Sequence, residues 1–288
     1  MLGYSRQSYY QGIKFTQKRL YESEVILQEV LRHRKLQKRL GTRKLLEEMK
    51  DFLDLHDFQL GRDAMFDLLR DHRLLVNKRK RSGPTTTFSK HRFRKYPNII
   101  RNFTPIAPNQ LWVSDITYLQ LNNGFAYLSL VTDAYSRKIV GYCLHKTLSS
   151  QGPLRAMKMA LLNNPQRSEL IHHSDRGVQY CCDDYVNLLQ SNEIRISMTE
   201  NGDPLENAIA ERVNGILKQE LILEPLASFK IAEEQVIIAC STYNYLRPHN
   251  SINNLKPAIA HQQSGNLKRK WKNYYKSIKR KGESMINV

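Results

Sequence analysis

The strongest constraint on the fold is a long β-rich run, Leu111–Leu121, that carries a single acidic residue, Asp115, in its middle. The apolar and β-branched residues on both sides of this aspartate predict a strand. The dipeptide Asn122-Asn123 and the glycine after it are typical of a hairpin turn. A charge in the middle of a strand is costly unless it meets a metal ion or a partner. The run therefore predicts a sheet that holds a functional carboxylate.

The residues after this hairpin predict alternating strands and helices. Further strands are expected at Phe125–Thr132, Ile139–Leu144, Leu170–His173 and Ile194–Met198. Helices are expected at about Gly152–Leu162, Asp183–Gln190, Leu205–Leu221 and Ala232–Tyr245. This order predicts an α/β domain in which helices pack on a mixed sheet. It is the order of a ribonuclease-H-like core, which we place at residues 102–262.

The net charge of +18 is distributed unevenly along the 288 residues. Residues 1–101 carry 24 Lys and Arg against 11 Asp and Glu, whereas residues 102–265 carry 13 against 15. Residues 266–288 carry 8 against 1. Such an excess indicates a polyanionic partner, either nucleic acid or an acidic membrane surface. A need for solubility would explain the size of the charge but not its concentration at the two ends.

Residues 1–76 predict an all-α domain. The first helix is expected within 13–40, with apolar positions at Leu20, Ile26, Leu27, Val30 and Leu31. Gly41 ends this helix, Thr42 caps a second one that runs to about Leu55, and a third covers about Arg62–His72. Short helices joined by tight turns in a basic segment fit a helix-turn-helix DNA-binding domain. A plain helical bundle fits the spacing equally well, and the charge favours DNA.

Two basic segments flank the predicted core. Residues 77–101 form a basic linker within a longer stretch, 72–114, that contains no Asp or Glu. Its candidate phosphate contacts are Lys78, Arg79, Lys80, Arg81, Arg92, Arg94 and Lys95. Residues 263–288 form a basic tail with interleaved aromatic residues, and its candidate contacts are Lys268, Arg269 and Lys270. A solvated linker and a disordered tail are the alternative interpretations.

Three carboxylates stand on rigid elements, as a two-metal phosphoryl-transfer site requires. Asp115 is in mid-strand, Asp175 ends the fourth strand in the turn Ser-Asp-Arg-Gly, and Glu211 lies on the long helix. One polar stripe of that helix consists of Asn207, Glu211, Asn214 and Lys218. For the helix alone, an exposed polar face is the better explanation.

Four ordered sequence blocks decide the interpretation. They read W-V-S-D-I-T-Y, H-H-S-D-R-G-V-Q-Y, S-M-T-E-N-G-D-P-L-E-N-A-I-A-E-R-V-N-G-I-L-K-Q-E and Y-N-Y-L-R-P-H-N-S-I. Together they resemble the integrase-like transposases of bacterial insertion sequences with two overlapping reading frames, and the chain looks like their second-frame product. The resemblance covers about residues 1–262. The 35 residues between Asp175 and Glu211 match that family's D-D-35-E signature.

The resemblance implies roles by position. Asp115, Asp175 and Glu211 would be the catalytic, metal-binding residues, and Lys218 would contact DNA near the reacting phosphate. The implied cofactor is a pair of Mg²⁺ ions, for which Mn²⁺ can substitute. The implied reaction is metal-dependent cleavage at transposon ends followed by 3′-OH strand transfer. Further expected DNA contacts are Arg62 and Arg247, although the Y-N-x-x-R-P-H block around Arg247 has either a structural or a DNA-facing role.

Two other functions compete with this one. The first is a nuclease of the same fold that only hydrolyses, and the second is a non-catalytic protein that binds transposon ends and regulates transposition. The expected partners are DNA, both transposon ends and target, at least a second copy of the chain, and an upstream-frame protein. The sequence has no apolar run of about 18 residues and no apolar signal region. We therefore expect no membrane span and a cytoplasmic, nucleoid-associated protein.

The remaining candidate ligands have structural explanations. The four cysteines, at positions 143, 181, 182 and 240, lack zinc-site spacing and are expected to be reduced thiols. Asp133 is expected to be a turn residue. His172 and His173 precede Asp175 closely, and we expect them to support the site, because Mg²⁺ prefers oxygen ligands.

Overall fold

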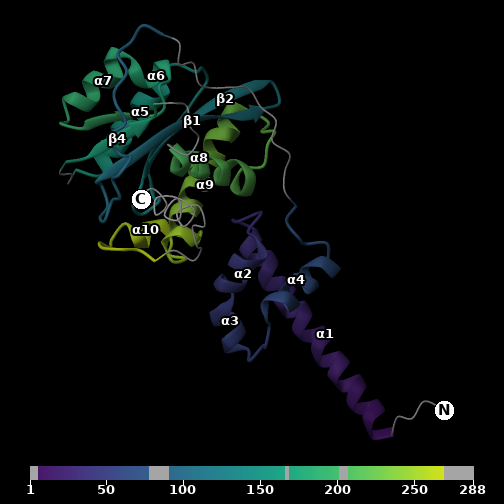
Figure 1. The fold of residues 1–288 in the computed structure, drawn as a ribbon. Coiled ribbons are helices and arrows are strands. Elements are labelled where there is room, and N and C mark those ends of the chain that lie inside the picture. The colour runs from purple at the N-terminus through teal and green to yellow at the C-terminus, as the bar shows by residue number, and fades with distance from the viewer. Residues whose placement is uncertain (1–5, 78–90, 166–168, 201–206, 269–288) are drawn as a thin grey trace, which may run out of the picture. The chain divides into compact units, whose positions relative to one another are not determined.

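The computed structural model describes residues 6–77, 91–165, 169–200 and 207–268 (Figure 1). The chain divides into two compact units, which are considered separately below. The first comprises residues 1–82 with 219–221, and the second comprises residues 83–218 with 222–288. Within the described ranges, every helix is too short or too polar to cross a membrane. Six predicted DNA contacts lie outside the described residues: Lys78, Arg79, Lys80, Arg81, Arg269 and Lys270.

The first unit is helical, as predicted. Its helices are α1 (Arg6–Arg34), α2 (Thr42–Glu48), α3 (Lys50–Leu55) and α4 (Arg62–Asp71). One apolar cluster joins the second half of α1 to the short helices and consists of Ile26, Val30, Leu40, Leu45, Met49, Leu53, Met65 and Leu69. This cluster includes residues of all three helices that follow α1.

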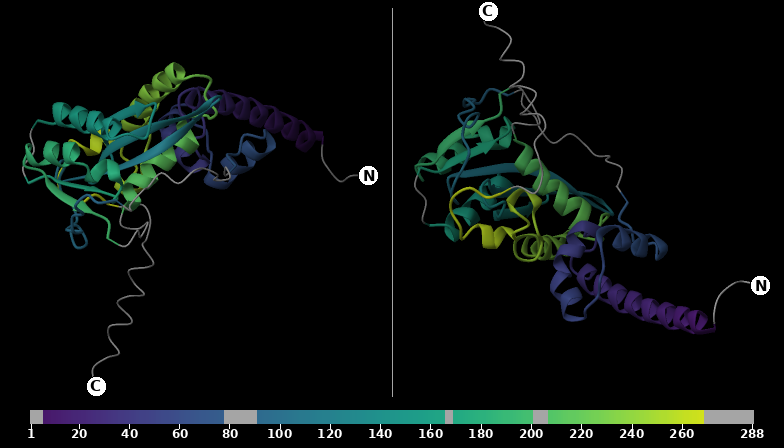
Figure 2. Two further views of the ribbon diagram at one scale, coloured as in Figure 1. Left: turned by 90° about the horizontal axis from the view of Figure 1, so that it is seen from above. Right: turned by 60° about the horizontal axis from the view of Figure 1, so that its bottom comes forward.

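Three details of the first unit differ from the prediction. The first helix begins at Arg6 rather than near residue 13, and its first half extends past the short helices (Figure 2). Packing within the unit therefore reaches only the second half, and Leu20 is 66% exposed. Within the second half, Ile26 and Val30 are buried, whereas Leu31 is 52% exposed. Thr42 is the first helical residue, without a side-chain capping bond, and the cap position belongs to Gly41. The predicted second helix is two helices that meet at Met49.

The second unit contains a five-stranded mixed sheet with the order β3-β2-β1-β4-β5. The strands are β1 (Leu111–Leu121), β2 (Gly124–Asp133), β3 (Ile139–His145), β4 (Ile171–Ser174) and β5 (Arg195–Met198). The first three form an antiparallel meander, whereas β4 runs parallel to β1 and β5 runs parallel to β4. The predicted hairpin turn is present, and Gly124 has a φ of 104°, which glycine adopts without strain.

Helices cover both faces of this sheet. On one side lie α5 (Gln151–Asn163), α6 (Val178–Cys181) and α7 (Asp183–Gln190), and on the other side lie α8 (Ala208–Ile216) and α9 (Phe229–Tyr245) (Figure 1). A π-helical turn, Leu217–Leu221, continues α8, and the short elements Asn250–Ile252 and α10 (Pro257–Ala260) follow α9. A meander of three strands extended by two parallel strands, with helices on both faces, is the predicted ribonuclease-H-like fold.

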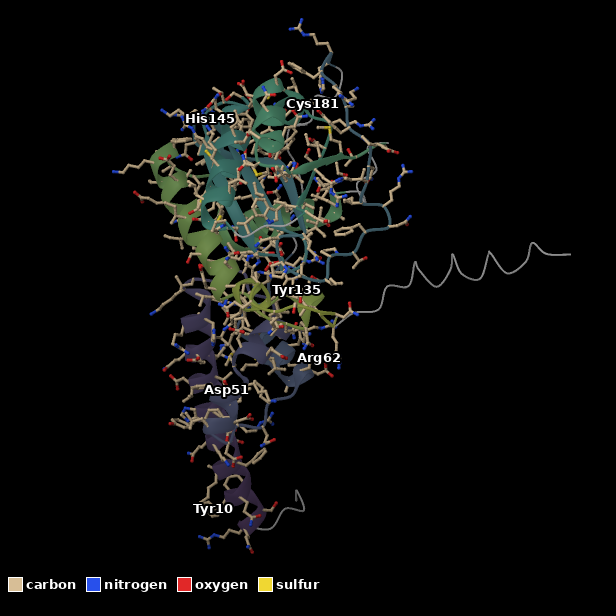
Figure 3. All side chains as sticks on the ribbon, turned by 90° about the vertical axis from the view of Figure 1, so that its left-hand side faces the viewer. Tyr10, Asp51, Arg62, Tyr135, His145 and Cys181 are labelled. Atoms are coloured by element: carbon tan, nitrogen blue, oxygen red, sulfur yellow. The ribbon has the colours of Figure 1, made fainter. Side chains whose placement is uncertain are left out.

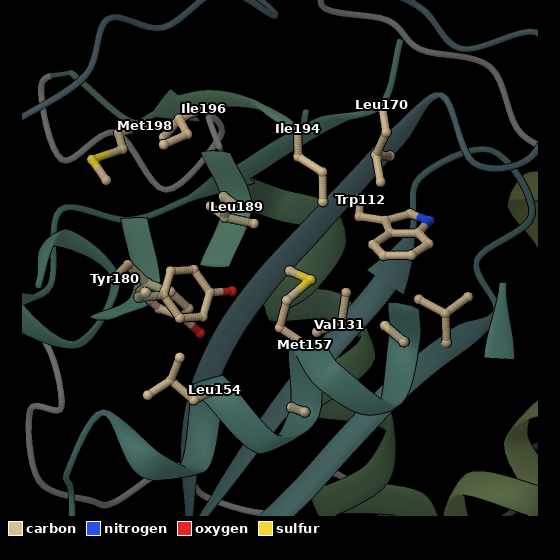
Figure 4. Packing of buried hydrophobic residues seen from close by; sticks show 14 of the residues in the cluster. Trp112, Val131, Leu154, Met157, Leu170, Tyr180, Leu189, Ile194, Ile196 and Met198 are labelled. Carbon is tan, nitrogen blue, oxygen red and sulfur yellow. The ribbon is translucent and has the colours of Figure 1, made fainter. Parts of the chain in front are cut away.

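Alternating residues of β1 separate the core from the face that carries the acidic residue. Trp112 and Ile116 join the main apolar cluster, which also contains Met157 of α5 and Leu189 of α7 (Figure 4). Leu111 and Val113 belong to a smaller cluster on the opposite face, which includes Ala210 of α8. Because successive side chains of a strand point to opposite faces, Asp115 shares the face of α8.

Residues 91–101 differ from the expected free linker, because they are packed on the second unit. Phe93 and Tyr96 contact the main apolar cluster. The amide of Ile99 donates to Oγ of Ser197, in β5, at 3.1 Å. Apolar side chains that point inward at these positions hold the segment against the sheet edge, so its basic residues lie on the surface of the second unit.

Candidate active site

Asp115 is held in place by hydrogen bonds to both of its carboxylate oxygens. The amide of Ile116 donates to Oδ1 at 2.9 Å, and Nδ2 of Asn214, on α8, donates to Oδ2 at 2.7 Å. Burial raises the pKa of Asp115 to about 7, and the negative charges of Asp175 and Glu211 add to the increase. The ionised carboxylate is therefore unfavourable here unless a positive charge accompanies it.

Asp175 follows the last residue of β4, where a strand ends and presents its side chain at the sheet edge. The amide of Gly177 donates to Oδ1 of Asp175 at 3.0 Å, which orients the carboxylate through a tight turn. A Cβ atom on residue 177 would lie 3.0 Å from that oxygen and 3.1 Å from Oε1 of Gln179. The glycine therefore lets the backbone approach the carboxylate as closely as it does.

Glu211 lies in the first turn of α8 and is exposed. Two buried asparagines of the predicted polar stripe attach this helix to β1. Nδ2 of Asn207 donates to the carbonyl oxygen of Ser114 at 3.0 Å, and Asn214 bonds to Asp115 as described above. The stripe is therefore only partly a solvent-exposed face, since its two asparagines anchor the helix that carries Glu211.

The three carboxylates come from three elements and are close enough to influence one another. Asp175 has the larger effect on the pKa of Asp115 and Glu211 the smaller one. Among the described residues, no three His, Cys, Asp or Glu side chains are close enough together to hold a metal ion in this conformation. The donor chemistry nevertheless fits a hard divalent cation, because all three groups are carboxylates and their mutual repulsion is what such a cation relieves.

Lys218 lies at the end of α8, in the π-helical turn, and its ammonium group contacts an aromatic ring of β1. Its Nζ atom is 3.5 Å from the centroid of the Tyr118 ring. Burial lowers the pKa of Lys218, and the nearby Glu224 carboxylate opposes that change. The predicted DNA-contacting lysine therefore lies beside the strand that carries Asp115.

The histidines before Asp175 are buried in hydrogen-bond networks beneath the site. Nε2 of His172 is 2.8 Å from Oγ of Ser114 and 3.1 Å from the hydroxyl of Tyr185. Nδ1 of His173 is 2.9 Å from Oγ of Ser197. Burial lowers the pKa of His172 to about 3, so its imidazole is neutral. These contacts agree with the supporting role that the sequence predicts.

Five of the predicted DNA-contacting residues are described by the structure and lie on the surface. Arg92, Arg94 and Lys95 are exposed on the packed segment 91–101, and Lys268 is exposed near the end of the described chain. Arg62 is exposed at the start of α4 (Figure 3), where its Nε atom pairs with Asp63 at 2.8 Å. All five positions are accessible to a polyanion.

The structure does not support the expected DNA contact of Arg247, because this side chain is only 1% exposed. Its Nη1 atom donates to the carbonyl oxygen of Pro248 at 3.3 Å. Nearby, Asn244 accepts from the amide of Ile139 and donates to its carbonyl oxygen, both at 2.9 Å, which ties α9 to β3. A guanidinium enclosed in this way cannot reach a phosphate, so the structure supports the structural role of this block.

Two smaller predictions agree with the structure. Asp133 is buried in the turn after β2, where it accepts bonds from the amides of Asn109 and Ser136 and from Oγ of Ser136. All four cysteines are free thiols. Sequence reasoning missed the contacts of Asn214 with Asp115 and of Tyr118 with Lys218. The position of Asn214 on the stripe of Glu211 was the available signal for the first of them.

Comparisons with known proteins identify the family. Two models, both described as integrase core domain, match residues 105–204 and 192–257. An insertion element IS600 protein of Shigella sonnei, described as an uncharacterized 31 kDa protein, is 31% identical over 265 residues, which are 90% of this chain and 95% of that protein. A putative transposase for IS986/IS6110 of Mycobacterium tuberculosis is 41% identical over 127 residues, 42% of this chain and 46% of that protein.

Among solved structures, the catalytic core of HTLV-2 integrase in complex with magnesium aligns with a TM-score of 0.44 and 19% identity. That alignment covers 55% of this chain and 99% of the integrase core. The family assignment rests on the sequence matches, of which the Shigella relative extends over nearly the whole chain. The chain therefore belongs to the transposases of bacterial insertion sequences that carry an integrase core, the DDE polynucleotidyl transferases.

Proposed function

We propose that this chain cuts DNA at the ends of its insertion sequence and joins the resulting 3′-OH to target DNA, with Asp115, Asp175 and Glu211 as the catalytic residues. The arrangement that carries the proposal is three carboxylates on β1, the end of β4 and α8, of which Asp115 is bonded directly to Asn214 of the helix that carries Glu211. Three acids from separate elements, placed at one face of the sheet, are what metal-dependent phosphoryl transfer needs.

Asp115, Asp175 and Glu211 would hold two Mg²⁺ ions, for which Mn²⁺ can substitute. When bound, these ions would stabilise the charge on the attacking and leaving oxygens of the phosphodiester. Asp115 and Asp175 are already oriented by backbone and amide donors. Glu211 is exposed, so its side chain can turn toward the other two when a cation binds.

The surrounding residues have distinct tasks in this proposal. Asn214 holds Asp115 in one orientation while it remains ionised. Lys218 binds a phosphate of the DNA strand beside the reacting one. The exposed Arg92, Arg94 and Lys95 line the edge of the catalytic unit and bind the DNA backbone through charge. The helical first unit, with Arg62 on its surface, contacts the transposon end.

The proposal also includes the setting in which the protein works. A transposase must bring two DNA ends together, so we propose at least a dimer on DNA. An upstream-frame protein is a further proposed partner. A chain that acts on bacterial DNA would work in the cytoplasm, at the nucleoid.

A strand-transfer assay tests the proposal. The full chain is incubated with labelled DNA that carries its element's ends and with Mg²⁺, beside the Glu211→Gln variant and an Asp183→Asn control on the exposed start of α7. Joined products that disappear only in the Glu211 variant are expected. Cleavage without joining would favour the nuclease, and binding without any reaction would favour the non-catalytic regulator.

A further inference from the structure

An aromatic pair lies beside the proposed catalytic site and has no part in the function described above. Tyr118 is on β1, three residues after Asp115, and its ring packs edge-to-face with that of Phe125 on β2, with centroids 5.4 Å apart. The pairing of β4 with β1 runs from Leu111 to Val113, so Tyr118 lies past the point where β4 borders β1. Phe125 is 43% exposed, so the pair is accessible from solvent.

The face of the Tyr118 ring receives a cation rather than an apolar neighbour. Nζ of Lys218 lies 3.5 Å from the ring centroid. An ammonium group on a flexible four-carbon stem is an exchangeable partner, because it can move to a phosphate when DNA arrives. The ring face that it leaves is wide enough for another flat π-system.

The π-helical turn that carries Lys218 supports this interpretation. It begins at Leu217, directly where α8 ends, and single π-helical turns occur frequently at functional sites. The turn directs Lys218 toward β1. It therefore brings the cation to the ring pair, two helical turns after Glu211 on the helix whose Asn214 holds Asp115.

The spacing along β1 relates the ring to the DNA. Three residues of a strand cover about 10 Å, or about three steps along a duplex. Because this spacing is odd, the Tyr118 side chain leaves β1 on the face opposite that of Asp115, and Lys218, which reaches the ring from the end of α8, connects the two. A nucleotide within about three positions of the reacting phosphate would therefore reach Tyr118. Aromatic rings beside basic residues bind unpaired bases, because each base has a flat face that stacks on a ring.

We propose that Tyr118 and Phe125 form a stacking site for one unpaired base of the DNA end, and that Lys218 leaves the ring to bind the phosphate of the same nucleotide. The inference rests on the proposed function, since it names the part of the substrate that this site holds. It also predicts that the DNA end opens locally when it binds.

A photocross-linking experiment tests the stacking site without requiring catalysis. The full chain with the Glu211→Gln substitution binds duplexes of its element's end in which 5-iododeoxyuridine replaces one of the nucleotides near the cleavage position. Irradiation links the iodinated base to an aromatic ring on which it stacks, and mass spectrometry locates the link. A cross-link to Tyr118 or Phe125 is expected from one position of the DNA.

Further variants distinguish stacking from a role in holding Lys218. Tyr118→Leu should lose the cross-link and bind the end roughly ten- to a hundredfold more weakly, whereas Tyr118→Phe should keep the cross-link. Phe125→Leu, at an exposed position, should weaken binding as well. Lys218→Ala should keep or strengthen the cross-link, because the ammonium group no longer competes for the face of the ring.

The proposal is overturned if the complex forms and no position cross-links to either ring, or if Lys218→Ala abolishes the link. A Tyr118→Leu variant with an unchanged affinity and unchanged melting temperature would overturn it as well. These outcomes are separate from failure of the proposed function, which is read from strand transfer by the chain without substitutions. A cross-link together with no strand transfer would retain the stacking site and remove the reaction.

Discussion

Replacing Asp115 by asparagine should stabilise the metal-free protein while abolishing its reaction. The pKa of this carboxyl is about 7 in the folded chain, against an ordinary value of 3.8. Between these two values the folded protein binds a proton that the unfolded chain releases. Stability that depends on this proton is complete below about pH 4 and is lost as the pH rises through about 7.

The size of the effect follows from these two pKa values. Their difference corresponds to about 4 kcal/mol at a pH at which Asp115 is ionised in both states. Solvent reaches part of the side chain, so screening reduces the expected gain of Asp115→Asn to about 2 kcal/mol. For a unit of this size, that gain raises the melting temperature by about 4–8 °C.

The hydrogen bonds of the site can accommodate the new amide. The amide of Ile116 donates a hydrogen bond to Oδ1 of Asp115, and the side-chain oxygen of an asparagine can accept the same bond. The amide nitrogen would face Nδ2 of Asn214, but Oδ1 of Asn214 is buried without a partner in the described structure. A flip of the Asn214 amide therefore restores the bond, and little of the electrostatic gain is lost.

Thermal unfolding with EDTA at pH 5 and pH 8 measures this difference, with the transition of the catalytic unit followed by tryptophan fluorescence. The variant should melt higher than the unsubstituted chain at pH 8 and by a smaller margin at pH 5, where the carboxyl of the folded chain is still protonated. Added Mg²⁺ should raise the melting temperature of the unsubstituted chain more than that of the variant. A gain that is larger at pH 5, or a loss of stability at pH 8, would refute the electrostatic reasoning.

Three further predictions concern single contacts. Gly177→Ala places a Cβ atom about 3 Å from the carboxylate of Asp175, so strand transfer should fall at least about tenfold with the melting temperature nearly unchanged. A Gly215→Ala control, where the added carbon meets nothing within 4 Å, should keep its activity. Lys218→Ala should reduce the slope of log affinity against log salt concentration by about 0.9 in a titration of DNA binding, and an unchanged slope would exclude a phosphate contact. Asn244→Ala removes two buried hydrogen bonds to the backbone of Ile139. The unfolding free energy, measured by chemical denaturation, should fall by about 2–3 kcal/mol. A loss below about 0.5 kcal/mol would contradict the structural role of Asn244.

The elements themselves were largely predictable, because their signals are local. The run Leu111–Leu121 and the segment Asp183–Gln190 form the predicted strand and helix with the same bounds. Strand alternation and apolar spacing depend on neighbours within a few residues, so a sequence contains them completely. The three acids were identified by their intervals in the blocks, which a sequence also contains.

The partners of individual side chains depended on the tertiary structure. Arg247 and Leu20 illustrate this in opposite directions, since the charged side chain is buried and the apolar one is exposed. Burial depends on which distant element covers a residue, and periodicity along one helix does not specify that element. The same reason explains Asn214 and Tyr118, whose contacts with Asp115 and Lys218 join residues about a hundred positions apart. The sequence by itself determined the order of strands and helices and the positions of the three acids. The packing of α8 against β1 decided that Asn214 holds Asp115 and that Tyr118 contacts Lys218.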